Sequence, residues 1–273
     1  MEQIQQKPGN FSVSRIVGAA YADSWRAARA IPLVVFTTFL LLLLIFAVRS
    51  ALGLQPDQFL RDIPLADRLA LSSAAQPFLF AVALATISLQ IAIHRYVLCE
   101  QQSSACSASL RRRQFWKYTA FVFVFQLTSF GISYLYFTGI VIICPAAGLF
   151  MMYIKARFSP IFPAIAICDD RNISYFFRLS KGRFWKIFIV SIFCSTPSSI
   201  LLFVPGAVVS YLDTGQLVMG LLAVFLYATS ALVTCMVTTA AASHIYRALE
   251  YPSAPMITKL EQDNPATVVL AAP

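Results

Sequence analysis

Charged residues along this chain are separated by long apolar stretches, and the lengths of these stretches predict membrane-spanning helices. A helix rises about 1.5 Å per residue, so roughly 20 apolar residues cross the roughly 30 Å of hydrocarbon in a bilayer. Stretches of this length predict six passes, at about residues 30–48, 75–95, 118–136, 138–156, 187–210 and 216–245. We therefore expect an all-α, polytopic membrane helix bundle.

Two of these passes come from a single uncharged stretch. The gap between Lys117 and Lys155 holds 37 uncharged residues, which is too many for one pass and about enough for two. We predict a hairpin that turns near residues 136–139. With the N-terminus inside, 18 of the 21 Lys and Arg residues then lie on the inner side. Lys and Arg favour the cytoplasmic side of a membrane, so both termini are predicted to be cytoplasmic.

The three tryptophans occupy equivalent places in the chain and indicate a repeat. Trp25, Trp116 and Trp185 are each followed by a basic residue, and each precedes an odd-numbered pass. This pattern predicts three units, each made of an amphipathic inner segment and a two-helix hairpin. The alternative is that Trp, Lys and Arg gather at membrane interfaces without any duplication. Both interpretations stay open at this point.

Two inner segments have the spacing of amphipathic helices. Residues 12–29 place apolar side chains on one face and charged side chains on the other, and residues 170–183 repeat this plan, with Gly182 as the stop. The apolar face of the first segment comprises Val13, Ile16, Val17, Tyr21, Trp25 and Ala28, and its charged face comprises Arg15, Asp23 and Arg26. We expect both helices to lie in the cytoplasmic interface of the membrane, with their apolar faces among the acyl chains.

These elements divide the chain into three parts. Residues 1–29 are the N-terminal tail and interfacial helix, residues 30–249 are the six-helix transmembrane domain, and residues 250–273 are a polar cytoplasmic tail that we expect to be disordered. Within the fifth pass, Pro197 and Pro205 are expected to bend or break the helix, because proline removes a helical hydrogen bond.

The composition excludes several classes of protein. Hydrophobic residues make up 59% of the chain and charged residues only 12%, whereas soluble domains carry about 25% charged residues. So few charges cannot cover a surface in water, which excludes a soluble domain, a coiled coil and a disordered chain. The six cysteines are scattered and none is placed on the outer side, so we expect no disulfide and no metal site.

Polar residues within the passes are few. The apolar stretches contain no Asp, Glu, Lys or Arg, since Arg95 and Lys155 count with the inner ends of their passes. Ion-coupled transporters usually place an ionisable group within a span, so this absence counts against such a carrier. Gln90 and Gln126 form the candidate intramembrane polar site, and hydrogen bonding between helices is the alternative role. A cavity lined by both glutamines would favour a carrier, and a closed bundle would favour an accessory role.

His94 and His244 sit at the inner ends of the second and sixth passes. They could meet across the bundle as a proton or metal site, but two ligands make a poor metal site. We therefore expect two interfacial histidines. No motif of a known catalytic site occurs in a suitable context, so we predict that the protein is not an enzyme and uses no cofactor.

Basic and tryptophan side chains together form a predicted lipid-contacting face on the inner side. The net charge of +9 is explained by the positive inner loops and by anionic lipid, which contributes about 1 kcal/mol per basic residue near the surface. Nucleic acid is not needed to explain it. The candidate headgroup contacts are Arg111, Arg112, Arg113, Trp116, Lys117, Arg178, Lys181, Arg183, Trp185 and Lys186.

Three segments of the chain share a pattern with a known family. They read YIKARFSP at residues 153–160, PAIAI at residues 163–167 and KGRFW at residues 181–185. In these segments the chain resembles the polytopic membrane domain that is fused to some glycerophosphoryl diester phosphodiesterases, and the stand-alone bacterial relatives of that domain. The family pattern has an arginine after a transmembrane helix, a Pro-Ala-Ile stretch, an acidic residue, and an amphipathic helix that ends near Lys-Gly.

The chain departs from this family in three respects. Phe176 and Phe177 stand where Ser-Trp is expected, and Cys168 and Asp169 stand where Glu is usual. The six passes leave no stretch for the catalytic phosphodiesterase domain, so the enzymatic activity is not carried over. The resemblance implies a bundle of the bacterial inner membrane.

Two functions are compatible with these features. We expect a non-enzymatic inner-membrane protein that supports membrane or lipid homeostasis by binding anionic lipids, a membrane protein or a second copy of itself. The alternative is a transporter or flippase for an amphiphilic or lipid-like solute, which the repeat and the proline-interrupted fifth pass favour. An intramembrane enzyme is disfavoured, because the chain offers no nucleophile–base pair and no set of metal ligands.

Overall fold

The computed structural model of this chain describes residues 11–54, 65–99, 113–137, 144–167, 169, 171–212 and 217–250. Every regular element in these ranges is an α-helix, which confirms the predicted all-α class. The helices are α1 (Val13–Ala30), α2 (Pro32–Ala51), α3 (Leu65–Cys99), α5 (Arg113–Phe137), α6 (Cys144–Phe158), α7 (Ile161–Ala166), α8 (Ile173–Leu179), α9 (Phe184–Leu212) and α10 (Leu217–Glu250). The predicted tail beyond Glu250 lies outside the described residues.

Three of the described helices are long and apolar enough to cross a membrane. They are α2, the segment Ala74–Cys99 of α3 and the segment Gly220–Glu250 of α10. A shorter apolar helix, Phe184–Pro197, forms the first half of α9. The uncharged stretch between Lys117 and Lys155 is shared by two helices, α5 and α6, and the turn predicted between them lies outside the described residues. Six passes in three hairpins stay a prediction.

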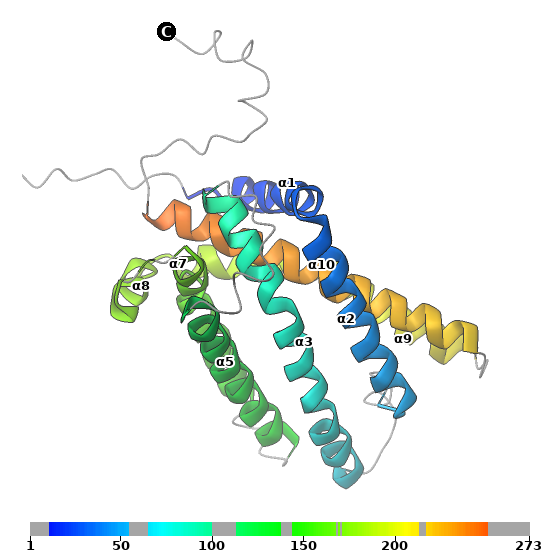
Figure 1. Cartoon of the computed structure of the whole chain (residues 1–273). Helices are drawn as coiled ribbons and strands as arrows, with labels where there is room; N and C mark the ends of the chain where they lie inside the picture. The colour runs from blue at the N-terminus through cyan, green and yellow to red at the C-terminus, as the bar shows by residue number, and fades with distance from the viewer. Residues whose placement is uncertain are drawn as a thin grey trace, which may run out of the picture.

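The helix α10 is central to the arrangement. It packs against α9 and also contacts α1, α2, α3 and α7. The helix α3 contacts α2 and α5, and α6 contacts α5 and α9. Figure 1 shows α1, α7 and α8 gathered at one end of the bundle, from which α2, α3 and α5 extend. The largest hydrophobic core joins side chains of α1, α2, α3, α9 and α10.

The first helix is more than the interfacial element that its pattern predicts. Ala20 and Ala27 are fully buried, because these small side chains let α1 approach α9 and α10 closely. Trp25 is exposed on the opposite side. The prediction that Asp23 faces the headgroups is wrong, since its Oδ2 lies 3.0 Å from Nε2 of His244 on α10. The apolar stripe is therefore only one of two packing faces of α1.

The prolines of α9 do not break it. The helix is continuous from Phe184 to Leu212, so a break at Pro197 or Pro205 is wrong, and a bend at these prolines stays a prediction. Proline cannot donate to the carbonyl four residues earlier, which leaves the carbonyl of Phe193 without its helical partner. The hydroxyl of Tyr21 on α1 donates to this oxygen at 3.3 Å. A neighbouring helix thus supplies the missing hydrogen bond, as is common for proline in membrane helices.

Four arginines in the described ranges bind the carbonyl ends of neighbouring helices. The last carbonyls of a helix have no partner within it and carry a partial negative charge. The donor and acceptor pairs are Arg95 with Ala166 of α7 (2.9 Å), Arg247 with Val97 of α3 (2.6 Å), Arg157 with Phe177 of α8 (2.6 Å) and Arg183 with Ala248 of α10 (3.4 Å). Part of the basic charge at this end therefore holds helices together.

Two short helices complete the basic end of the bundle. The pattern of residues 163–167 gave no indication of α7, which packs against α3, α5 and α10. The predicted amphipathic helix 170–183 is shorter than expected, since α8 spans only Ile173–Leu179. It ends three residues before the predicted stop, and Gly182, with φ +77°, lies in the turn between α8 and α9, a conformation that glycine adopts without strain. Phe176 is buried under α8, as its apolar stripe predicts.

Candidate functional site

A cavity of about 670 Å³ lies among α3, α5, α6, α7, α9 and α10, and both predicted glutamines line it. Gln90 comes from α3 and Gln126 from α5. The two glutamines of the predicted polar site therefore line the same cavity. Its apolar lining includes Leu79, Val82, Val122, Phe125, Phe162 and Ile192. The volume is in the range of about 300–1,000 Å³ that is usual for pockets holding small molecules.

One edge of the cavity is a chain of hydrogen bonds that begins on α10 and ends on α3. Ser243 Oγ lies 2.7 Å from Nδ1 of His94, and Nε2 of His94 lies 3.3 Å from the hydroxyl of Tyr118. The Tyr118 hydroxyl donates to Oε1 of Gln90 at 2.7 Å, and Nε2 of Gln90 donates to Oγ1 of Thr86 at 3.1 Å. The donor and acceptor roles of the two His94 nitrogens depend on its tautomer, and the Ser243 hydroxyl also donates to the carbonyl of Thr239 at 3.2 Å.

This network holds the Gln90 side chain in place, with its amide group donating to Thr86 and its carbonyl oxygen accepting from Tyr118. Thr86, Gln90 and His94 follow one another at intervals of four residues, so they share one face of α3. That spacing is a signal in the sequence that could have identified the network.

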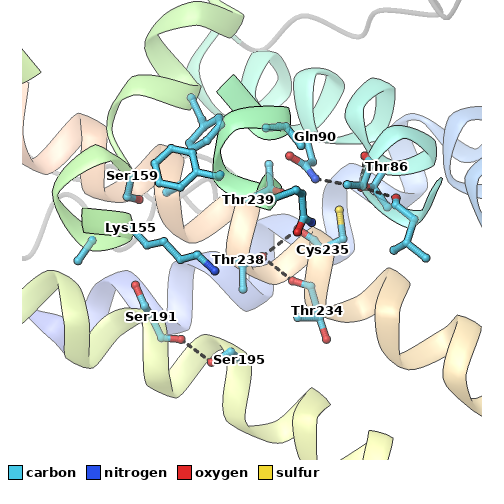
Figure 2. Close-up of a pocket in the computed structure, with 18 of the residues that line it drawn as sticks. Thr86, Gln90, Lys155, Ser159, Ser191, Ser195, Thr234, Cys235, Thr238 and Thr239 are labelled. Atoms are coloured by element: carbon cyan, nitrogen blue, oxygen red, sulfur yellow. Dashed lines mark hydrogen bonds between the residues drawn. The ribbon is translucent and has the colours of Figure 1, made fainter. Parts of the chain in front are cut away.

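Lys155 is a cavity residue that sequence reasoning missed. The charge pattern of the sequence placed Lys155 among the inner-side charges. Figure 2 instead shows its side chain extended into the cavity toward Ser191 and Thr238. Lys155 therefore adds a positive charge to the candidate site. The position of Lys155 at the end of an apolar stretch did not reveal its direction, because α6 turns this face toward α9 and α10.

The opposite wall of the cavity presents hydroxyl groups whose protons are already used. Ser191 on α9 donates to Ile187 O at 2.9 Å, and Thr238 on α10 donates to Thr234 O at 2.7 Å. Figure 2 shows these hydroxyls facing the space into which Lys155 extends. Hydrogen-bond donors with free protons therefore lie on the wall that carries α5 and α6.

The cavity opens at the side of the bundle. Leu79 on α3, Met152 on α6 and Ile192 on α9 all line it, yet 43%, 52% and 42% of their respective surfaces are exposed. Such large apolar side chains on apolar helices are the surface that contacts lipid tails in a membrane. The cavity therefore opens beside exposed apolar side chains of α3, α6 and α9.

The two histidines do not pair. His94 bonds to Ser243 and Tyr118, whereas His244 bonds to Asp23. Their exposed fractions are 1% and 2%, so the expectation of interfacial side chains is wrong as well. Among the described residues, no three His, Cys, Asp or Glu side chains come together in a way that could hold a metal ion.

The predicted headgroup residues are only partly brought together. Arg111 and Arg112 lie outside the described residues. Arg183 is used by the carbonyl end of α10. The other candidates are exposed on α5 or on the α8–α9 segment, namely Arg113, Trp116, Lys117, Arg178, Lys181, Trp185 and Lys186. Exposure suits a contact with lipid headgroups, but nothing described here joins these two groups into one pocket.

A charged cluster near α8 was also missed by sequence reasoning. Nε of Arg171 lies 2.9 Å from both carboxylate oxygens of Asp169, and its Nη1 binds Glu250 at the end of α10. The Tyr246 hydroxyl donates to Asp169 at 2.7 Å. The guanidinium of Arg171, with smaller help from Tyr246, holds the pKa of Asp169 below its ordinary value of 3.8. The cluster fastens the chain before α8 to α10.

We expect Asp169→Asn to lower the stability of the folded chain by about 1–2 kcal/mol at pH 7, since a charged hydrogen-bond acceptor is lost. Because the folded-state pKa of Asp169 is lowered, its stabilising effect is complete above pH 3.8 and fades as the pH falls through the folded-state value. Thermal unfolding in detergent at pH 7 and at about pH 3 measures both effects. An equal difference between wild type and variant at the two pH values would contradict this assignment.

No protein-family model matches this chain, and neither the curated proteins nor the solved structures contain a match to it.

Proposed function

We propose that this protein is a carrier in the bacterial inner membrane that binds an amphiphilic solute in the cavity among α3, α5, α6, α9 and α10. The observation that carries this proposal is the cavity itself, which is lined by both Gln90 and Gln126 and combines polar side chains with a larger apolar surface. Polar groups that converge in an apolar cavity are typical of small-molecule sites.

The position of the mouth favours a solute that arrives from the membrane. Met152 and Ile192 flank the cavity on helices that contact each other, and both are exposed on the outer surface of the bundle. A solute with an apolar body can enter by this route without crossing bulk water. A strictly polar solute would have no comparable path.

The accessory role that the sequence favoured first is less well supported. A closed bundle would have favoured it, whereas a cavity lined by both Gln90 and Gln126 favours the carrier. The proline-interrupted helix no longer favours the carrier, because α9 is continuous. The support for the carrier now comes from the cavity and from the positive charge of Lys155 that lines it. As part of the proposal, the protein is not an enzyme, its termini are cytoplasmic, and its exposed basic residues contact anionic headgroups.

Photolabelling of the full chain in lipid vesicles tests this proposal. The probes are hexadecyl amphiphiles that carry a diazirine on the chain and differ only in the head group: carboxylate, phosphate, hydroxyl or trimethylammonium. We expect at least one probe to label peptides that contain Tyr118–Gln126 or Ala231–Thr239, and unlabelled amphiphile to compete. Labelling confined to exposed surfaces such as Phe36 and Leu40 on α2 would overturn the proposal.

Movement of the solute is measured separately. Vesicles that contain the protein and a dye-labelled lysophospholipid are treated with dithionite, which quenches only the dye in the outer leaflet. A carrier should allow the protected fraction to decay faster than in protein-free vesicles. Cavity labelling without faster decay would point to a binding role and would remove transport from the proposal.

A further inference from the structure

We infer that the amphiphile carries an anionic group, a carboxylate or a phosphate, that binds Lys155 and Ser159. This inference rests on the proposed function and specifies the chemistry of its solute. It is carried by the charges and the free donors of the cavity wall.

Lys155 is a cation without a counter-ion. Within the described part of the chain it makes no hydrogen bond and no ion pair. The described side chains that line the cavity include no Asp and no Glu. His94 lines it too, but both ring nitrogens are engaged by Ser243 and Tyr118. An anionic solute in the cavity would supply the opposite charge that the described lining does not offer to Lys155.

The donors that remain free lie on one wall. Ser159 follows Lys155 by four residues, and Figure 2 shows both on the same side of the cavity. The Ser159 hydroxyl and the Gln126 amide have no partner among the described residues. An ammonium, a hydroxyl and an amide N–H all donate, which is what the oxygens of a carboxylate or phosphate accept.

The other wall offers acceptors to the Lys155 ammonium and few donors to an anion. The hydroxyls of Ser191 and Thr238 donate to carbonyls of their own helices, so they offer mainly lone pairs to the cavity. Lone pairs repel an anion and attract an ammonium. The apolar side chains nearer the mouth, such as Leu79 and Ile192, then contact the hydrocarbon part of the solute.

The head-group comparison of the photolabelling experiment tests this inference with the wild-type chain. We expect the carboxylate and phosphate probes to label the cavity peptides about tenfold more than the hydroxyl or trimethylammonium probe, because a hydrogen bond to a charged group contributes about 1.5–3 kcal/mol. If one of the two anionic probes labels the cavity peptides more strongly, it identifies whether the site binds a carboxylate or a phosphate. Equal labelling by the alcohol and the anions would overturn the inference and leave the proposed function standing. No cavity labelling by any probe would remove the proposed function first.

Variants then assign the preference to Lys155. Lys155→Gln should reduce labelling by the anionic probes to the level of the alcohol probe, whereas Lys155→Arg should keep most of the preference. Arg15→Gln is the matched control, since it removes one exposed positive charge on α1 away from the cavity. An unchanged preference in Lys155→Gln, with the thermal unfolding of wild type, would show that another group selects the anion.

Discussion

Replacing Arg157 with alanine is expected to lower the stability of the folded chain by about 2–5 kcal/mol. Arg157 is 5% exposed, and its Nη2 donates to the carbonyl of Phe177 at 2.6 Å. Its guanidinium also lies 4.0 Å from the centre of the Phe177 ring. The expected loss combines about 1.5–3 kcal/mol for a charged hydrogen bond with about 0.5–2 kcal/mol for the contact between cation and ring. Without Arg157, α8 loses its main attachment to α6.

This loss is measured by thermal unfolding in detergent. The reaction of buried cysteines with a fluorescent maleimide reports the unfolding. Arg178→Ala is the control, because Arg178 is exposed on the same short helix and its removal should cost less than about 0.5 kcal/mol. Arg157→Lys should recover only part of the stability, since an ammonium cannot reproduce the planar contact with Phe177. Equal midpoints for Arg157→Ala and Arg178→Ala would show that Arg157 is not the attachment.

Filling the cavity is expected to abolish solute binding while leaving the bundle folded. Ala231 on α10 lines the cavity, so Ala231→Trp places an indole in the space that the solute would occupy. Labelling of the cavity peptides should fall about tenfold or more, because a close-packed site does not expand to admit both groups. The variant should unfold near the wild-type temperature, since the indole enters space that is open in the wild-type protein.

The same substitution on the other face of α10 provides the control. Val233 is two residues away, is 36% exposed and does not line the cavity. Val233→Trp should therefore keep cavity labelling at the wild-type level. Loss of labelling in both variants would attribute the effect to disturbance of α10, and retention in both would place the bound probe elsewhere.

Much of the fold could be predicted from the sequence, because its strongest determinant is local. The lengths of apolar stretches identified most of the long helices, and the separation of α5 from α6 followed from the length between Lys117 and Lys155. Gly182 marked the end of the segment that contains α8, because the conformation of a glycine is also a local property of the chain. The helix α7 was missed, because two prolines near a six-residue apolar run resemble a loop.

The features that could not be predicted depend on contacts between distant residues. The continuity of α9 at Pro197 depends on Tyr21, which lies 172 residues from its acceptor Phe193. The sequence identified Gln90 and Gln126 as a polar site because they interrupt apolar stretches. It could not show that Lys155 joins them, because a lysine at the end of a helix can extend toward water or toward a neighbouring helix. Only the packing of α6 on α9 decides between these directions.

The hydrogen bond between His244 and Asp23 has a consequence for the order of events during biosynthesis. The two residues are 221 positions apart, and α1 packs chiefly on the last two helices of the chain. At roughly 5–20 residues per second, about 10–45 s pass between the synthesis of Asp23 and that of its partner. During this interval the membrane interface can hold α1 through the apolar side that carries Trp25. The amphipathic pattern of α1 therefore suits its place at the membrane interface before α10 is synthesised. Its small buried residues suit its later packing against α10.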